Sequence, residues 1–180
     1  MIVISPAKRL TTNTSDSSLE ATVPVFKKEA DLLATELAKL STEELSSMMK
    51  VSEKIAELNA GRYRNWNKSN AEEKRAIFQF EGDVFKHLGA KDLSDNQIQY
   101  MNDNLRILSG IYGLLKPSDE MSPYRLEMGT RHDFYGSANL YEFWGDKIAK
   151  ELLEELGSSY LFNLASEEYF SAISKFLNAE

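Results

Sequence analysis

The stretch from Leu105 to Thr130 constrains the fold more than any other part of the chain. It opens with Leu-Arg-Ile-Leu, an apolar run typical of a buried strand. The rest of the stretch holds residues that restrict or free the backbone: Gly110, Gly113, Pro117 and Pro123. Glycine after a buried strand predicts a tight turn or a close approach of another segment. Two prolines in one loop remove unfolded-state freedom, so we expect Tyr124, Arg125 and Glu127 to be held in place.

Composition excludes several kinds of site. The 180 residues contain no cysteine and only two histidines, His87 and His132. Disulfides, thiolate nucleophiles, iron–sulfur clusters and cysteine zinc sites are therefore excluded, and we expect no metal site and no cofactor. The N-terminal Met-Ile-Val-Ile-Ser-Pro has neither the basic region nor the long apolar region of a signal peptide. With no apolar run near the roughly 18 residues of a spanning helix, we expect a cytoplasmic protein that does not enter membranes.

The charge is uneven along the chain. The net charge of −7 argues against indiscriminate binding to nucleic acid or anionic membranes. The segment Lys50–Arg75, however, has seven basic and four acidic residues, a net of +3. The segment Glu151–Glu180 has six acidic residues and one basic residue, a net of −5. The basic segment is the part to which an anionic partner would bind.

The hydrophobic pattern predicts a mixed chain of short strands and helices. We expect a mobile loop over Thr11–Ser18 and inward-facing Ile55, Ala56 and Leu58 in one of the helices. The predicted strands are Ile2–Ile4, Ala76–Phe80, Leu105–Leu108 and Tyr160–Asn163. For Ala76–Phe80 the alternative is the end of a helix that begins near Asn70, and Glu81-Gly82-Asp83 favours the strand. The predicted helices are Val25–Leu40, Ser41–Met49, Ser52–Tyr63, Ser94–Asn104, Asn139–Leu156 and Ser166–Phe176. Capping boxes at Ser41/Glu44 and Ser94/Gln97 mark two helix starts. The fold class is α/β or α+β, with a mixed sheet flanked by helices in one domain over residues 1–180.

Polar residues come directly after three of the predicted strands. If these strands are parallel neighbours, their loops meet at one edge of the sheet, where ligands bind in open α/β folds. Arg125 and Glu127, two residues apart on an extended segment, would share a face of that cleft. The cleft candidates are Lys8, Ser109, Tyr112, Arg125, Glu127, Asn163 and Glu167. No complete catalytic constellation is present, and the alternative interpretation is a structural Arg125–Glu127 pair, which is common in proteins.

Motifs in a fixed order over nearly the whole chain resemble the peroxide stress protein YaaA family of bacteria. They include Ile4-Ser5-Pro6-Ala7-Lys8, Lys50-Val51-Ser52-Glu53-Lys54-Ile55-Ala56, Leu105-Arg106-Ile107-Leu108-Ser109-Gly110-Ile111-Tyr112-Gly113, Pro123-Tyr124-Arg125-Leu126-Glu127-Met128-Gly129 and Asn163-Leu164-Ala165-Ser166-Glu167-Glu168-Tyr169. The resemblance implies an unusual fold with a helix-hairpin-helix element at about residues 41–65. It also implies DNA binding and protection against hydrogen peroxide by limiting unincorporated iron. Members of the family continue past this point, so we expect this chain to lack the C-terminal part of the family domain.

The hairpin supports two interpretations. A helix-hairpin-helix holds DNA phosphates with backbone N–H groups and basic side chains, which positions DNA without reading its sequence. The DNA-binding candidates are Lys50, Ser52, Lys54, Arg62, Arg64 and Lys68. Lys50 and Ser52 stand where such hairpins usually carry glycine, and the alternative is two packed helices joined by a short turn. Tyr63 and Trp66 are expected in the core rather than as base-stacking platforms.

The sequence therefore leaves three functions open. The first is DNA binding to duplex or branched DNA through phosphate contacts, as the resemblance implies. The second is an enzyme that acts on a phosphorylated or nucleotide-like small molecule in the Lys8–Arg125–Glu127 cleft. The third is an effect on iron through a protein partner, without metal binding by the chain itself. The sequence does not indicate an oligomeric state.

Overall fold

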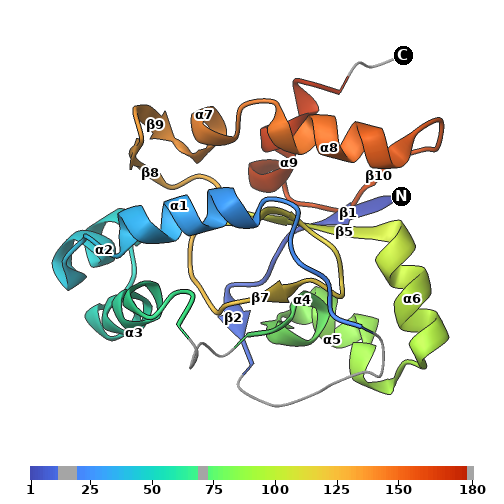
Figure 1. Cartoon of the computed structure of the whole chain (residues 1–180), viewed down its shortest axis with the longest axis horizontal. Coiled ribbons are helices and arrows are strands. Elements are labelled where there is room, and N and C mark those ends of the chain that lie inside the picture. Colours follow the sequence, from blue (N-terminus) through green and yellow to red (C-terminus); the bar gives the residue numbers. More distant parts are fainter. Residues whose placement is uncertain (12–19, 69–72, 178–180) are drawn as a thin grey trace.

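A computed structural model describes residues 1–11, 20–68 and 73–177. The loop predicted over Thr11–Ser18 lies almost entirely outside these residues. The described part is a mixed α/β structure in which a central mixed sheet is flanked by helices, so the predicted fold class is confirmed (Figure 1).

The central sheet brings together strands that are far apart in the sequence. Its order is β10-β1-β5-β6, and the strands are β1 Ile2–Ile4, β5 Leu105–Ser109, β6 Gly113–Leu115 and β10 Phe162–Asn163. β1 pairs in parallel with both β5 and β10, whereas β6 is antiparallel to β5. The sequence left open whether these strands are parallel neighbours, and the structure shows that β1 lies between β5 and β10, parallel to both. Val3, Ile107 and Leu108 are fully buried and form the middle of the core.

Helices cover the sheet on both sides. In Figure 1, α7–α9 lie above β1 and β5, and α4 and α5 lie below them. These helices span α4 Ala76–Gln79, α5 Asp83–Leu88, α7 Leu140–Trp144, α8 Lys147–Leu156 and α9 Glu167–Ser174. A 3-10 turn at Ala90–Asp92 and α6 Asp95–Asn104 lead into β5. The capping box predicted at Ser94 and Gln97 is present at the start of α6.

Three short antiparallel ladders hold the connecting segments in place. β2 pairs with β4, β3 with β7, and β8 with β9. Their bounds are β2 Arg9–Leu10, β4 Phe80–Glu81, β3 Lys74–Arg75, β7 Glu120–Met121, β8 Arg131–Phe134 and β9 Ser137–Asn139. The β2–β4 and β3–β7 ladders join segments that are far apart in the sequence, whereas β8 and β9 form a local hairpin.

The helices α2 Thr42–Met49 and α3 Glu53–Arg64 lie at one end of the molecule, and α1 Lys27–Leu37 runs from that end toward the middle (Figure 1). The Ser41 hydroxyl accepts a hydrogen bond from the Glu44 N–H at 3.2 Å, and Glu44 accepts one from the Ser41 N–H at 2.7 Å. This capping box confirms the predicted start of α2.

The inward face of α3 differs from the prediction. Ala56 is buried as expected, but Ile55 is 37% exposed and Leu58 is 54% exposed. The buried residues are Ala56, Asn59, Ala60 and Tyr63, at spacings of three and four. α3 is therefore turned by about one residue, 100°, from the predicted orientation. Small residues and one tyrosine, rather than the larger aliphatic side chains, pack against the molecule.

Two other predictions of secondary structure are wrong. Ala76–Gln79 is a short helix rather than a strand. The prediction failed because the periodicity of such a short apolar run does not distinguish a buried helix from a buried strand. Asn139–Leu156 is not one helix: α7 ends at Gly145, whose φ of 52° and ψ of −124° cannot continue a helix. This break lets the fully buried Trp144 donate its indole N–H to the Gly110 carbonyl at 3.0 Å.

Gly110 allows the close approach that the sequence predicted. A Cβ atom at this position would lie 2.3 Å from the Leu126 carbonyl oxygen, a distance that no side chain tolerates. The loop after β5 therefore lies against the backbone of the segment that carries Arg125 and Glu127.

We expect Gly110→Ala to destabilise the protein by about 1–3 kcal/mol or more, because the new methyl group must displace backbone atoms. Urea unfolding followed by circular dichroism measures this loss. Gly61→Ala in α3 is the matched control, since its Cβ would meet nothing within 4 Å and alanine favours helix. Equal stability of Gly110→Ala and the unmodified protein would contradict this packing.

Candidate functional site

Three loops meet at the carboxyl edge of β1, β5 and β10, as expected for parallel neighbours. Ser5 directly follows β1, and its hydroxyl accepts a hydrogen bond from the Ser166 N–H at 2.8 Å. The Ser5 hydroxyl also donates to the Ser166 hydroxyl at 3.2 Å. This link joins the loop after β1 to the start of α9, so the two ends of the chain converge at one edge.

Glu127 binds two cations from different parts of the chain. Lys8 Nζ lies 3.0 Å from Glu127 Oε2, and Arg125 Nη2 donates to Glu127 Oε1 at 2.8 Å. The Lys8 side chain is 66% exposed, whereas those of Arg125 and Glu127 are 19% and 28% exposed. We call these three residues the Lys–Glu–Arg cluster. It confirms that Arg125 and Glu127 share a face and places Lys8 beside them.

Tyr63 anchors the backbone of this cluster to α3. Its hydroxyl donates a hydrogen bond to the Arg125 carbonyl at 2.6 Å. Burial raises the pKa of the Tyr63 phenol, so the group stays protonated and remains a donor at neutral pH. The prediction that Tyr63 lies in the core is confirmed, and half-buried Trp66 donates its indole N–H to Asp31 at 2.8 Å.

Ser109 and Tyr112, which the sequence placed in the cleft, are instead fully buried beneath it. The Ser109 hydroxyl lies 2.6 Å from the Tyr124 hydroxyl and accepts a hydrogen bond from the Tyr112 N–H at 3.0 Å. The Tyr112 hydroxyl accepts one from the Ser122 N–H at 2.9 Å. These bonds fix the loop that carries Arg125 and Glu127, so Ser109 and Tyr112 position the cluster rather than contact a ligand.

Asn163 and Glu167 lie at the sheet edge but are not part of the Lys–Glu–Arg cluster. Both side chains are exposed, and Asn163 accepts a hydrogen bond from the Ala165 N–H at 2.9 Å within its own loop. The neighbouring Glu168 instead accepts from the Gly129 N–H at 2.8 Å. The sequence analysis did not name Glu168 as a site candidate. Its position next to Glu167, in the Ser-Glu-Glu-Tyr stretch at the start of α9, was the signal that could have identified it.

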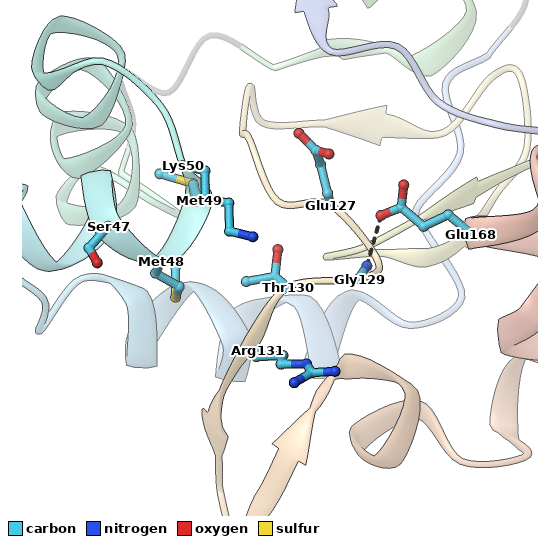
Figure 2. Close-up of a pocket in the computed structure, with 9 residues that line it drawn as sticks. All are labelled: Ser47, Met48, Met49, Lys50, Glu127, Gly129, Thr130, Arg131 and Glu168. Atoms are coloured by element: carbon cyan, nitrogen blue, oxygen red, sulfur yellow. Dashed lines mark hydrogen bonds between the residues drawn. The ribbon is translucent and has the colours of Figure 1, made fainter.

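Two cavities flank the cluster. The first, of about 530 Å³, is lined by residues of α2, the 127–131 segment and α9 (Figure 2). We call it the hairpin cavity, and its lining residues are Ser47, Met48, Met49, Lys50, Glu127, Gly129, Thr130, Arg131 and Glu168. The second, of about 740 Å³, has Ser5, Lys8, Arg9, Gly82, Lys86 and Ser166 among its lining residues, and we call it the strand-end cavity. Because Glu127 lines the first and Lys8 the second, their ion pair lies between the two.

The turn between α2 and α3 places Lys50 at the hairpin cavity. Lys50 adopts a left-handed conformation, with φ 53° and ψ 47°, which is usual for glycine and less common for other residues. Figure 2 shows its side chain extending from the end of α2 toward Thr130. The hairpin and the polar cleft, which the sequence placed in separate parts of the chain, therefore share one cavity.

The other hairpin candidates differ in their surroundings. Ser52, Lys54, Arg64 and Lys68 are exposed. Arg62 is half-buried and donates to Asn59 at 3.3 Å. Most basic side chains of this segment are thus exposed to solvent, as binding to an anionic partner requires.

Neither a metal cluster nor a membrane helix is found in the part of the chain that the structure describes. Residues 1–11, 20–68 and 73–177 contain no group of three or more His, Cys, Asp or Glu side chains that could hold a metal ion. Over the same residues, no helix is long and apolar enough to cross a membrane.

Together, the fold and site define a mixed α/β protein in which a lysine-bearing helical hairpin adjoins the polar edge of a parallel sheet. Residues 1–179 match the family model described as "Peroxide stress protein YaaA". The chain belongs to this family.

Curated relatives named UPF0246 protein agree with this assignment. The relative from Shewanella woodyi is 44% identical over 178 residues, which cover 96% of this chain and 70% of the relative. The relative from Idiomarina loihiensis is 46% identical over an alignment of 188 residues, covering 100% of this chain and 72% of the relative. The relative from Clostridium botulinum is 43% identical over 176 residues, which cover 96% of this chain and 68% of the relative.

Proposed function

We propose that this protein binds DNA without sequence specificity through the α2–α3 hairpin, as part of a cytoplasmic response to peroxide. The observation that carries the proposal is the turn at Lys50. It has the left-handed conformation that a glycine hairpin would adopt, and it presents a lysine beside the first turn of α3.

The start of α3 has the features of a phosphate-binding site. Ser52 is the N-cap in an extended conformation, and its side chain caps no N–H group of the helix. The first turn of a helix leaves N–H groups without helical partners, and its partial positive charge attracts phosphate. Exposed Ser52 and Lys54 lie at this end, and Lys50 precedes it by two residues. Glu53, in the same turn, opposes anion binding and keeps the affinity of one hairpin modest.

The remaining cations extend this surface along α3. Arg64 is the last residue of α3, Lys68 lies four residues further along the chain, and both side chains are exposed. The Lys68 ammonium donates a hydrogen bond to the Asn65 side-chain oxygen at 3.1 Å. Such groups contact the phosphate backbone and leave the base edges unread, which supports binding without sequence specificity.

Charge reversal at the hairpin tests this proposal. We expect Lys50→Glu and Lys54→Glu each to weaken binding to a fluorescent duplex by roughly tenfold or more, and to lower the salt slope by about one per lost phosphate contact. Fluorescence anisotropy at several salt concentrations, with duplex and junction DNA, measures both. Lys91→Glu, at an exposed lysine of the Ala90–Asp92 turn, is the matched control and should bind normally. The proposal fails if DNA is not bound at low salt or if the hairpin variants bind as the control does.

We further propose that the protein protects cells from hydrogen peroxide by limiting unincorporated iron. The family description supports the peroxide part, and the iron part rests on the resemblance of the sequence motifs. Electron paramagnetic resonance of chelated iron in whole cells is the test. In a strain that lacks its own family member, expression of this chain should lower the iron signal under peroxide. An unchanged signal with improved survival would contradict the iron route.

A second candidate function is an enzyme acting on a phosphorylated small molecule at the Lys–Glu–Arg cluster. The observation in its favour is that Lys8 and Arg125 hold one carboxylate between two cavities. A phosphate would compete for these cations, because a guanidinium and an ammonium group both bind phosphate strongly.

Turnover distinguishes this candidate from a structural cluster. Release of inorganic phosphate from a panel of phosphate monoesters should be detectable and should fall at least tenfold in Glu127→Gln, which retains hydrogen bonding but not the charge. Glu154→Gln, at an exposed residue of α8, is the matched control. Absence of phosphate release in the unmodified protein, or equal rates in both variants, would remove this hydrolytic function.

A further inference from the structure

The hairpin cavity has walls from three separate parts of the fold. The end of α2 forms one wall, the turn at Gly129 and Thr130 forms the floor, and α9 contributes Glu168 from the opposite side (Figure 2). Its volume of about 530 Å³ lies within the roughly 300–1,000 Å³ range of small-molecule pockets. Met48 and Met49 add apolar surface, as in most ligand pockets.

Three charged groups that line this cavity have no ion-pair partner in the part of the chain that the structure describes. They are Lys50, Arg131 and Glu168, and the described residues offer none of them an opposite charge within ion-pair distance. The contrast with Glu127 is clear, because both of its oxygens already contact cations. Within the described structure, Lys50, Arg131 and Glu168 are therefore available to a ligand.

The charges in the cavity are of both signs. Lys50 and Arg131 supply two positive charges, and the carboxylate of Glu127 is already bound by Lys8 and Arg125. Glu168 supplies one negative charge, and one of its oxygens is already fixed by the Gly129 N–H. The cavity thus complements a dianionic group on the side of α2 and β8 and a single cation on the side of α9.

We propose that the hairpin cavity binds a small molecule that carries both a phosphate and a protonated amine. Lys50 and Arg131 bind the phosphate, with Arg131 able to donate two parallel hydrogen bonds. Glu168 accepts from the ammonium group, and its bond to Gly129 fixes the carboxylate so that little side-chain freedom is lost on binding. A simple inorganic anion would leave Glu168 unpaired beside a like charge and is disfavoured.

This ligand site is separate from DNA binding. It has one consequence, which rests on the proposed DNA-binding function. Lys50 belongs both to the cavity and to the hairpin. A ligand that holds Lys50 in the cavity removes it from the DNA phosphate. Occupancy of the cavity should therefore weaken DNA binding, which would make the cavity a control site for the hairpin.

Isothermal titration calorimetry of the purified chain with phosphoethanolamine tests the ligand class without DNA. Inorganic phosphate and ethanolamine are the two halves of this probe. We expect saturable binding at one site, with both halves binding at least tenfold more weakly. Glu168→Gln should bring the affinity for phosphoethanolamine down to that for phosphate, while the amide oxygen still accepts from Gly129. Arg131→Gln should weaken phosphoethanolamine and phosphate alike.

A control and a second measurement make the outcomes decisive. Glu154→Gln and Lys91→Gln should bind phosphoethanolamine normally, since both residues are exposed and line neither the hairpin cavity nor the strand-end cavity. The absence of saturable binding, or equal affinity in Glu168→Gln and Glu154→Gln, would overturn the assignment while leaving DNA binding untouched.

DNA anisotropy with and without saturating phosphoethanolamine tests the consequence. Weaker DNA binding in its presence supports shared use of Lys50, and unchanged DNA binding overturns that use. A protein that binds phosphoethanolamine but no DNA would refute the proposed DNA-binding function and leave the ligand site standing.

Discussion

The arrangement of this surface depends on the two ion pairs that the Glu127 carboxylate makes. It holds Lys8, from the loop after β1, and Arg125, from the segment that follows β7. The carbonyl of Arg125 is in turn held by Tyr63 of α3. Two cations on one partly buried carboxylate therefore tie the sheet edge, the long loop and the helical hairpin together. Removing that charge would leave two cations without a partner at the junction of three segments.

This junction explains why the hairpin and the sheet edge form one surface. The turn at Lys50 faces the same cavity as Glu127 and Glu168, although Lys50 and Glu168 are 118 residues apart in a chain of 180. Gly110 makes the junction possible, because only a residue without Cβ lets the loop after β5 lie on the Leu126 carbonyl. Lys50 therefore belongs to both the hairpin and the cavity.

Much of the fold could be predicted from the sequence where local signals were strong. Capping boxes located α2 and α6, and short apolar runs followed by polar residues located β1, β5 and β10. The break at Gly145 was missed because tertiary packing of Trp144, not helix propensity, sets the end of α7. The side chains of Arg131 and Glu168 could not be assigned to a site, since only the fold brings β8 and α9 to the same cavity.

We propose that the hairpin and the 127–131 segment form one binding surface. Amide chemical shifts of the ¹⁵N-labelled protein during titration with a short DNA duplex test it most directly. Shifts at residues 47–54 together with residues 127–131 are the predicted result, because Lys50 and Glu127 line the same cavity. Shifts confined to the hairpin, or shifts in neither segment, would contradict the claim.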